Sequence, residues 1–430
     1  MKKILSVLLG ITLVLSLNAC SSDEDNFDNS IEYFESDEGL FNFTISGQYA
    51  SLSSLNLDSN YKYEGEYITQ ISVPKTYTYN SISYDVTTIS SNAFKSKSSI
   101  EIVILPDTVT TISSSAFSGC SSLLKIQMPT NLTSIGNYAF QYCNSLRIMD
   151  LSECNTSIGN YAFDGCYSLE DVILNDSTQS IGEYAFQYCY LLEGINLPEE
   201  LTIIKSYTFR NCFSLTEITI PDKVNTIDTY AFHNCIDLED VTLGESVITI
   251  GANAFSYCYD LQKIYLNESL ITIGNSAFTS CLSLNDITIP SSVTSIGTSA
   301  FASCVSLKEI TIPNTVTSLS TSLFSGCVSL ETVNLSEGVT SIANSAFYNC
   351  NSLVNITLPN TLVSIGSSAF EGCNLLTNIH IPLNTVTIDA YAFRYCSILS
   401  ITVAMPQSNL PAGWSSSWNA SNCEVTYGVN

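Results

Sequence analysis

Positively charged residues are scarce in this sequence. Only 14 of its 430 residues are Lys or Arg, against 40 Asp and Glu, which gives a formal net charge of −26. A surface with this charge repels the phosphates of nucleic acids and the headgroups of anionic lipids. The composition therefore argues against a nucleic-acid-binding protein and against a protein that lies flat on a membrane surface.

Residue patterns that support catalysis or metal binding are also missing. The two histidines, His233 and His380, lie far apart in the sequence, and neither belongs to a recognisable nucleophile motif. The sequence has no Cys-x-x-Cys pair typical of zinc sites, no glycine-rich phosphate loop and no Asp-rich calcium repeat. We therefore expect no catalytic residues, no metal ion and no cofactor, and thus a protein that is not an enzyme.

A strict repeat dominates what the sequence does contain. Phenylalanine recurs every 23 residues through fourteen copies, at positions 94, 117, 140, 163, 186, 209, 232, 255, 278, 301, 324, 347, 370 and 393. A fixed period of this length is typical of a solenoid, in which each coil buries its apolar side only against its neighbours. Such a stack offers a long row of equivalent surface positions, so we expect a binding surface rather than a catalytic cleft.

Each repeat contains a short strand after the phenylalanine. In the copy that begins at Phe278, Cys281 follows three residues later, and the run Ile287-Thr288-Ile289 ends at Pro290. The alternation of period two points the two isoleucines inward and the residues eight and ten after Phe outward. Proline then ends the strand because it has no N–H with which to continue a ladder.

The motif Cys-x-x-Leu-x-x-Ile-x-Ile-Pro, followed by Val-x-x-Ile-Gly-x-x-Ala-Phe, resembles the BspA-type leucine-rich repeat of bacterial surface proteins. The resemblance covers about Ile71 to Val403. It implies a right-handed leucine-rich repeat solenoid of about 14 coils of 23 residues, with parallel β-strands on the concave side, short turns or 3-10 segments elsewhere, and a cap at each end. Because the family is associated with adhesion to host proteins, cells or other bacteria, it also implies a protein or cell-surface partner.

The first residues are typical of a secreted lipoprotein. Lys2 and Lys3 precede an apolar stretch, and the tetrapeptide from Leu17 to Cys20 resembles the lipobox in which the cysteine thiol is lipidated. Eight acidic residues between Asp23 and Glu38 predict a solvated tether, and its first part resembles the surface-export signal of Bacteroidetes lipoproteins. An ordinary signal peptide and a plain acidic linker are the alternatives.

These features predict five segments and a location. The segments are a signal peptide (1–19), an acidic lipidated tether (20–40), an N-terminal cap (41–88), the solenoid (89–403) and a C-terminal cap (404–430). We expect the chain at the cell surface, anchored to the outer membrane through a lipid on Cys20. In the last segment, Trp414 and Trp418 either cover the final coil or form a platform for a sugar.

Cysteines also follow the repeat. Thirteen of the sixteen lie on the 23-residue period, three residues after Phe, from Cys120 to Cys396. Coils stack about 4.8 Å apart, and parallel Cβ atoms at that spacing do not reach the ~3.8 Å that a disulfide needs. We expect buried, inert thiols, while bridges that involve Cys154 or Cys423 remain open.

Two surfaces are candidates for binding. The outward strand positions predict a stripe of threonines beside carboxylates on the concave face. Its residues are Glu217, Thr219, Asp240, Thr242, Tyr265, Asp286, Thr288, Glu309 and Thr311. Threonine also suits any exposed strand, so the stripe has a structural explanation as well. The second surface is a tyrosine-rich flank made of Tyr184, Tyr188, Tyr190, Tyr257 and Tyr259. Tyrosine is favoured at binding surfaces, but packing between coils would also explain these residues.

Two functions of different class follow from these surfaces. The first is adhesion, in which the solenoid face of a surface-anchored lipoprotein binds a host or bacterial protein or another cell-surface partner. The alternative is a carbohydrate-capturing or purely structural component of the cell surface, in which aromatic residues would carry any glycan binding.

Overall fold

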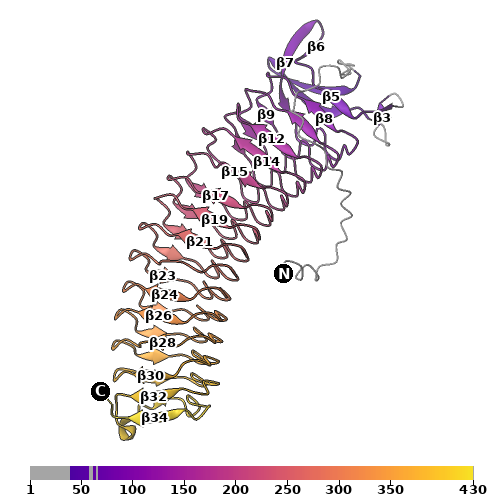
Figure 1. The fold of residues 1–430 in the computed structure, drawn as a ribbon. Helices are drawn as coiled ribbons and strands as arrows, with labels where there is room; N and C mark the ends of the chain where they lie inside the picture. Colours follow the sequence, from indigo (N-terminus) through magenta and orange to yellow (C-terminus); the bar gives the residue numbers. More distant parts are fainter. Residues whose placement is uncertain (1–38, 58–61, 64–65, 430) are drawn as a thin grey trace. The chain divides into compact units, whose positions relative to one another are not determined.

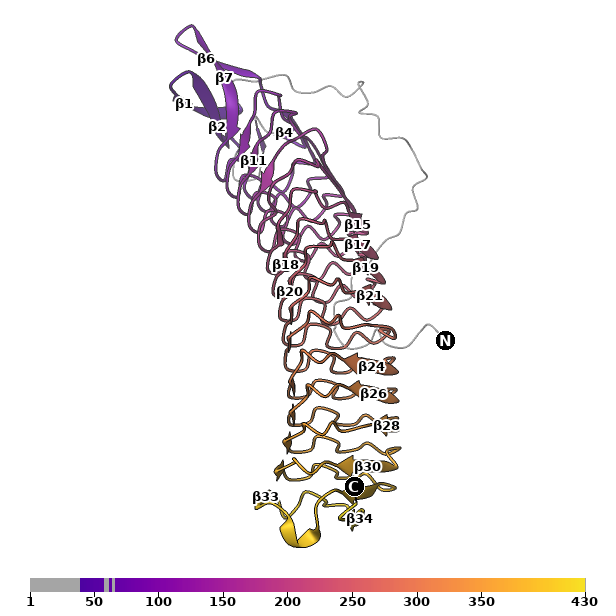
Figure 2. The same cartoon turned by 90° about the vertical axis from the view of Figure 1, so that its left-hand side faces the viewer.

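The computed structural model describes residues 39–57, 62–63 and 66–429. The predicted signal peptide, most of the acidic tether and Cys20 lie outside the described residues. The described part is a stack of coils with two rows of short parallel strands, as the 23-residue period predicts (Figures 1 and 2).

The first strand row carries the alternating Ile-x-Ile segments. Its strands are β5 (Gln70–Ser72), β8 (Ile102–Ile104), β10 (Lys125–Gln127), β12 (Ile148–Leu151), β14 (Asp171–Leu174), β15 (Gly194–Ile195), β17 (Glu217–Thr219), β19 (Asp240–Thr242), β21 (Lys263–Tyr265), β24 (Glu309–Ile312), β26 (Thr332–Leu335), β28 (Asn355–Ile356), β30 (Asn378–Ile381), β32 (Ser400–Val403) and β34 (Glu424–Tyr427). Figure 1 shows their arrows stacked one beside the next.

The second strand row lies in the part of the repeat that precedes Phe. Its strands are β7 (Ile82–Ile89), β9 (Thr111–Ile112), β11 (Ser134–Ile135), β13 (Ser157–Ile158), β16 (Ile203–Ile204), β18 (Thr226–Ile227), β20 (Thr249–Ile250), β22 (Thr272–Ile273), β23 (Ser295–Ile296), β25 (Ser318–Leu319), β27 (Ser341–Ile342), β29 (Ser364–Ile365), β31 (Thr387–Ile388) and β33 (Gly413–Trp414). A lone bridge between Ile158 and Ile181 continues the row between β13 and β16.

The two ends of the stack depart from the repeat. At the start, β1 (Phe41–Ser46) and β2 (Tyr49–Leu55) form an antiparallel pair, β3 (Lys62–Tyr63) pairs with β4 (Glu66–Tyr67), and β6 (Thr76–Tyr79) pairs with β7. The strand rows already begin here, since β5 and β7 lie parallel to β8 and β9. At the other end, a 3-10 segment, η1 (Gln407–Asn409), precedes the last strands.

Parallel register places each residue beside its equivalent in the next coil. In β17 and β19, Glu217 lies opposite Asp240 and Thr219 opposite Thr242, which in both cases is a step of one repeat. The same register holds in the second row, where Ser134 lies opposite Ser157. Equivalent positions of the repeat therefore stack on one another from coil to coil.

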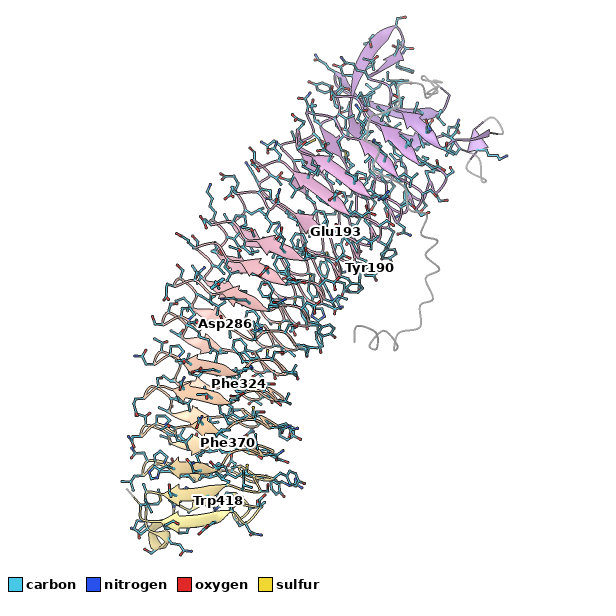
Figure 3. All side chains as sticks on the ribbon, in the orientation of Figure 1. Tyr190, Glu193, Asp286, Phe324, Phe370 and Trp418 are labelled. Carbon is cyan, nitrogen blue, oxygen red and sulfur yellow. The ribbon has the colours of Figure 1, made fainter. Side chains whose placement is uncertain are left out.

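The phenylalanines form a continuous spine inside the stack. Each is fully buried, and successive ring centroids lie between 4.6 Å and 5.8 Å apart with nearly parallel planes. At the C-terminal end, Trp418 lies nearly perpendicular to Phe393 with ring centroids 6.0 Å apart, and the indole N–H of Trp414 donates to the carbonyl of Thr385. Figure 3 marks Phe324, Phe370 and Trp418 along the stack. These contacts support a covering role for both tryptophans.

Each ladder cysteine has a hydrogen-bonding role that its buried position alone does not predict. The thiol of Cys281 donates to the carbonyl of Phe255 in the preceding coil at 3.2 Å, and all thirteen ladder thiols repeat this contact at 3.0 Å to 3.3 Å. Burial raises the pKa of Cys258 to about 12, so the thiol keeps its proton. All fifteen cysteines that the structure describes are free thiols, including Cys154 and Cys423.

The turn around each phenylalanine uses left-handed backbone. In all fourteen copies the residues two before and two after Phe have positive φ, for example 53° at Ser276 and 60° at Ser280. Serine, asparagine, glycine and tyrosine share these positions. The close approach of coils has a second signature: a Cβ on Gly274 would lie 2.6 Å from the backbone nitrogen of Ala252, which explains the recurring glycine four residues before Phe.

Truncation of one spine ring tests how far the stack depends on it. Phe255→Ala should lower the free energy of unfolding by about 3 to 5 kcal/mol, because the void lies between two rings that cannot close over it. Urea unfolding followed by circular dichroism measures this loss. Phe213→Ala is the matched control, since Phe213 is only partly buried, and a loss at Phe255 no larger than at Phe213 would contradict the proposed role of the spine.

Candidate functional site

The nine residues predicted for the concave face lie together on one surface. We call this surface the strand face: the outward side chains of the first strand row. All nine predicted residues are exposed, whereas the inward residues between them, such as Ile218, Val241 and Ile310, are buried. The parallel pairing of β17, β19 and β21 aligns Glu217 with Asp240 and Thr242 with Tyr265. The remaining four continue the row through Asp286 and Thr288 to β24.

A charged and aromatic cluster occupies the middle of the strand face. The ammonium nitrogen of Lys263 lies 3.0 Å from a carboxylate oxygen of Asp286 and 4.4 Å from the ring centroid of Tyr265. Hydrogen bonds to Tyr265 and Asp286 raise the pKa of Lys263. Tyr265 is 70% exposed, the highest value among the large hydrophobic side chains that the structure describes. Figure 3 marks Asp286 in the middle part of the stack. Lys263 was not among the predicted residues, although it stands eight residues after Phe255.

Farther along the strand face, polar side chains bond to one another across coils. The side-chain amide of Asn334 donates to a carboxylate oxygen of Glu309 at 2.9 Å and to the hydroxyl of Thr311 at 3.2 Å. These exposed bonds orient Glu309 and Thr311. The strand face is thus a row of ordered polar groups.

The tyrosine-rich flank is arranged differently. Five tyrosines two residues before Phe stack face to face, and Tyr184 lies 4.3 Å from Tyr161 and 4.4 Å from Tyr207 by ring centroids. Tyr190 is likewise held between Tyr167 and Phe213, at 5.1 Å and 4.7 Å. The faces of these rings contact each other, so edges and hydroxyl groups are what they present to solvent.

The other predicted tyrosines make edge contacts. Tyr188 meets Tyr190 at 6.1 Å and Tyr257 meets Tyr259 at 6.2 Å, both nearly perpendicular. Tyr184 and Tyr257 also adopt the left-handed backbone described above. Tyrosine is strained in that conformation, and stacking against the next coil offsets the strain at Tyr184.

A row of polar side chains directly after Phe was missed by the sequence analysis. The carboxylate of Asp164, which is 3% exposed, accepts hydrogen bonds from the amides of Gln141 and Gln187 at 2.9 Å and 3.2 Å. Burial raises the pKa of Asp164. The signal was available, because polar residues recur at this position in consecutive repeats.

The same row continues through a cation and a histidine. The guanidinium of Arg210 lies 5.9 Å and 5.7 Å from the rings of Tyr188 and Tyr207. The hydroxyl of Ser256 donates to the carbonyl of Asn253, so it accepts from the Nδ1–H of His233 at 2.7 Å. Burial first, and then the charge of Arg210, lowers the pKa of His233 to about 4.

Two further findings concern metal ions and membranes. In residues 39–57, 62–63 and 66–429, no group of three His, Cys, Asp or Glu side chains is placed to hold a metal ion. The same described residues contain no helix long and apolar enough to cross a bilayer.

Comparison with known proteins places the chain in a family. The model of the BspA type leucine rich repeat region matches residues 87–213, 179–308 and 294–412. The chain belongs to this family. The predicted resemblance is therefore confirmed, and with it the leucine-rich repeat solenoid, a fold of binding or structural proteins.

Two solved structures of bacterial leucine-rich repeat proteins are similar over most of the chain. One, from Bacteroides ovatus, is 28% identical, covers 90% of this chain and 97% of its own, and has a TM-score of 0.76. A leucine rich cell surface protein from Faecalibacterium prausnitzii is 27% identical, covers 86% of this chain and 94% of its own, and has a TM-score of 0.52. No curated protein matches the chain.

The lowered pKa of His233 predicts a specific loss of stability in acid. Below pH 6.5 the unfolded chain gains a proton on this histidine, whereas the folded protein does so only near pH 4. Stability from neutral His233 is thus complete above pH 6.5 and lost as the pH falls to 4. Because the side chain is partly solvated, we expect a contribution of about 1 to 2 kcal/mol.

Urea unfolding of the wild type and of His233→Gln between pH 7 and pH 4 measures this contribution. Protonation of carboxylates affects both proteins alike, so the difference between the two curves isolates His233. The wild type should lose more stability than the variant over this interval, and parallel curves would contradict the assignment.

Proposed function

We propose that the protein binds a protein or cell-surface partner through its strand face and so acts in adhesion at the cell surface. The observation that carries this proposal is the contrast within each strand of the first row. Inward residues such as Val241 and Ile264 are buried and nearly identical from coil to coil, while the exposed residues beside them vary. Packing explains the inward residues, and it does not require the outward set from Glu217 to Thr311.

The arrangement of the tyrosine-rich flank supports the strand face over the carbohydrate alternative. Sugars bind aromatic residues through an accessible ring face. Both faces of Tyr184 and of Tyr190 are covered by neighbouring rings. Tyr265 on the strand face, by contrast, is largely exposed.

We further propose that the protein is anchored to the outer membrane through a lipid on Cys20. The lipobox-like Leu17 to Cys20, the preceding apolar stretch and the acidic residues that follow support this anchor. The cell-surface name of the Faecalibacterium relative is consistent with it. Cys20→Ala should release the protein from the membrane fraction or leave it unprocessed, whereas the control Cys423→Ala should stay in that fraction. Unaltered acylation of the Cys20 variant would refute the anchor.

The strand face is tested by the combined variant Asp240→Lys, Tyr265→Ala and Asp286→Lys. Attachment of cells that display it to host or bacterial surfaces should fall about tenfold, since charge and the exposed aromatic group change together. Its free energy of unfolding should change by no more than about 0.5 kcal/mol per substitution, because all three side chains are exposed.

A matched control makes the same changes away from the strand face: Glu183→Lys, Asp389→Lys and Tyr348→Ala. The control should attach like the wild type. If the strand-face variant attaches normally and a variant with alanine at Tyr184, Tyr188 and Tyr190 does not, the tyrosine-rich flank is the binding surface and the proposal fails.

A further inference from the structure

A hollow interrupts the strand face between β14 and β17. It has a volume of about 650 Å³, and residues of three coils line it, among them Gly194 of β15. Asp171 and Glu217 occupy the equivalent outward position in the coils on either side. Gly194 places no side chain between them, and open space lies above its Cα.

The backbone does not require a glycine at this position. A Cβ built on Gly194 would meet no atom within 4 Å. By contrast, a Cβ on Gly251 or Gly274 would collide with the backbone of the preceding coil. The close packing of coils therefore does not require glycine at position 194. The absence of a side chain there instead adds to the open space of the hollow.

Carboxylates surround the hollow on two sides. Asp171 and Glu217 project from the strands, and Asp176 and Glu199 lie in the turns that follow. Within the described part of the chain none of the four forms an ion pair, while the adjacent Glu200 is neutralised by Lys223 at 2.6 Å. A protein with a net charge of −26 supplies little else to balance them.

The turn carboxylates belong to a longer row. The residue thirteen after Phe is acidic in six consecutive coils: Glu153, Asp176, Glu199, Asp222, Glu245 and Glu268. Coils repeat about every 4.8 Å, and like charges at that spacing repel each other. This repulsion opposes folding and would be relieved by a ligand of opposite charge.

We propose that the hollow at Gly194 binds an extended basic segment of a partner protein. This inference rests on the proposed function of the strand face and names the chemistry of its partner. Lys or Arg side chains of the segment would enter between the strand and turn carboxylates. Ile173, which is 48% exposed and lines the hollow, would contact their aliphatic stems. The unpaired carboxylates around the hollow complement the positive charges of such a segment, and this is why we propose a basic partner.

The test measures binding of a fluorescent peptide of alternating Arg and Gly to the purified protein, by anisotropy at about 0.15 M salt, where long-range attraction is screened. The combined variant Asp171→Asn, Glu199→Gln and Glu217→Gln should weaken binding about tenfold. Gly194→Arg, which keeps every carboxylate but fills the hollow with a cation, should weaken it as much. Gly194→Ala should bind within about twofold of the wild type.

The matched control removes three exposed carboxylates elsewhere: Glu183→Gln, Asp260→Asn and Asp389→Asn. It should bind within about twofold of the wild type. An equal loss in this control would show that net charge alone attracts the peptide, and normal binding by Gly194→Arg would show that the hollow does not hold it. Equal binding of a peptide of alternating Glu and Gly would also overturn the inference.

Attachment assays separate this inference from the proposed function. If the hollow variant attaches normally while the Asp240, Tyr265 and Asp286 variant does not, the hollow is refuted and the strand face still stands. If neither variant loses attachment, the adhesive role of the strand face and the role of the hollow are both refuted. Loss of attachment in both, with the peptide result above, supports the two together.

Discussion

Each coil of this protein packs against the next, and the register of 23 residues determines which side chains of adjacent coils contact each other. Parallel pairing sets each side chain beside its own equivalent, so a residue that packs well in one coil packs well in all of them. The phenylalanine spine and the thiol bonds to the phenylalanine carbonyls both follow from this register. A change of one residue in the length of a coil would misalign both at once.

The same constraint separates two kinds of surface. On the strand face, alternation points every second side chain to solvent, where it contacts neighbouring coils only through exposed polar groups, and these residues differ in charge and size. On the flank, Tyr184 and Tyr190 stack between rings of the neighbouring coils, and the faces of these two rings are used by the fold. The strand face therefore leaves whole side chains accessible to a partner, whereas the stacked tyrosines of the flank leave only ring edges and hydroxyl groups.

The sequence alone predicts the features that depend on periodicity. The buried phenylalanines, the inward Ile287 and Ile289 and the exposed Asp240 and Tyr265 all follow from a period of 23 and an alternation of two. Other features depend on contacts between residues at different positions of the repeat in adjacent coils. The left-handed turns, the pairing of Asp164 with Gln141 and Gln187, and the hollow at Gly194 require the path of the backbone between strands, which the repeat pattern does not contain.

The cysteine ladder has a consequence for the lifetime of the folded state. In the stack each ladder thiol is buried and unpaired, and it donates its proton to a carbonyl of the preceding coil. Once a stretch of coils opens in an oxidising medium, several identical thiols become reactive together and can join in many wrong combinations. Covalent bonds would then block reclosure, so in such a medium the lifetime of the folded state would depend on the rate of opening rather than on the equilibrium between folded and unfolded protein.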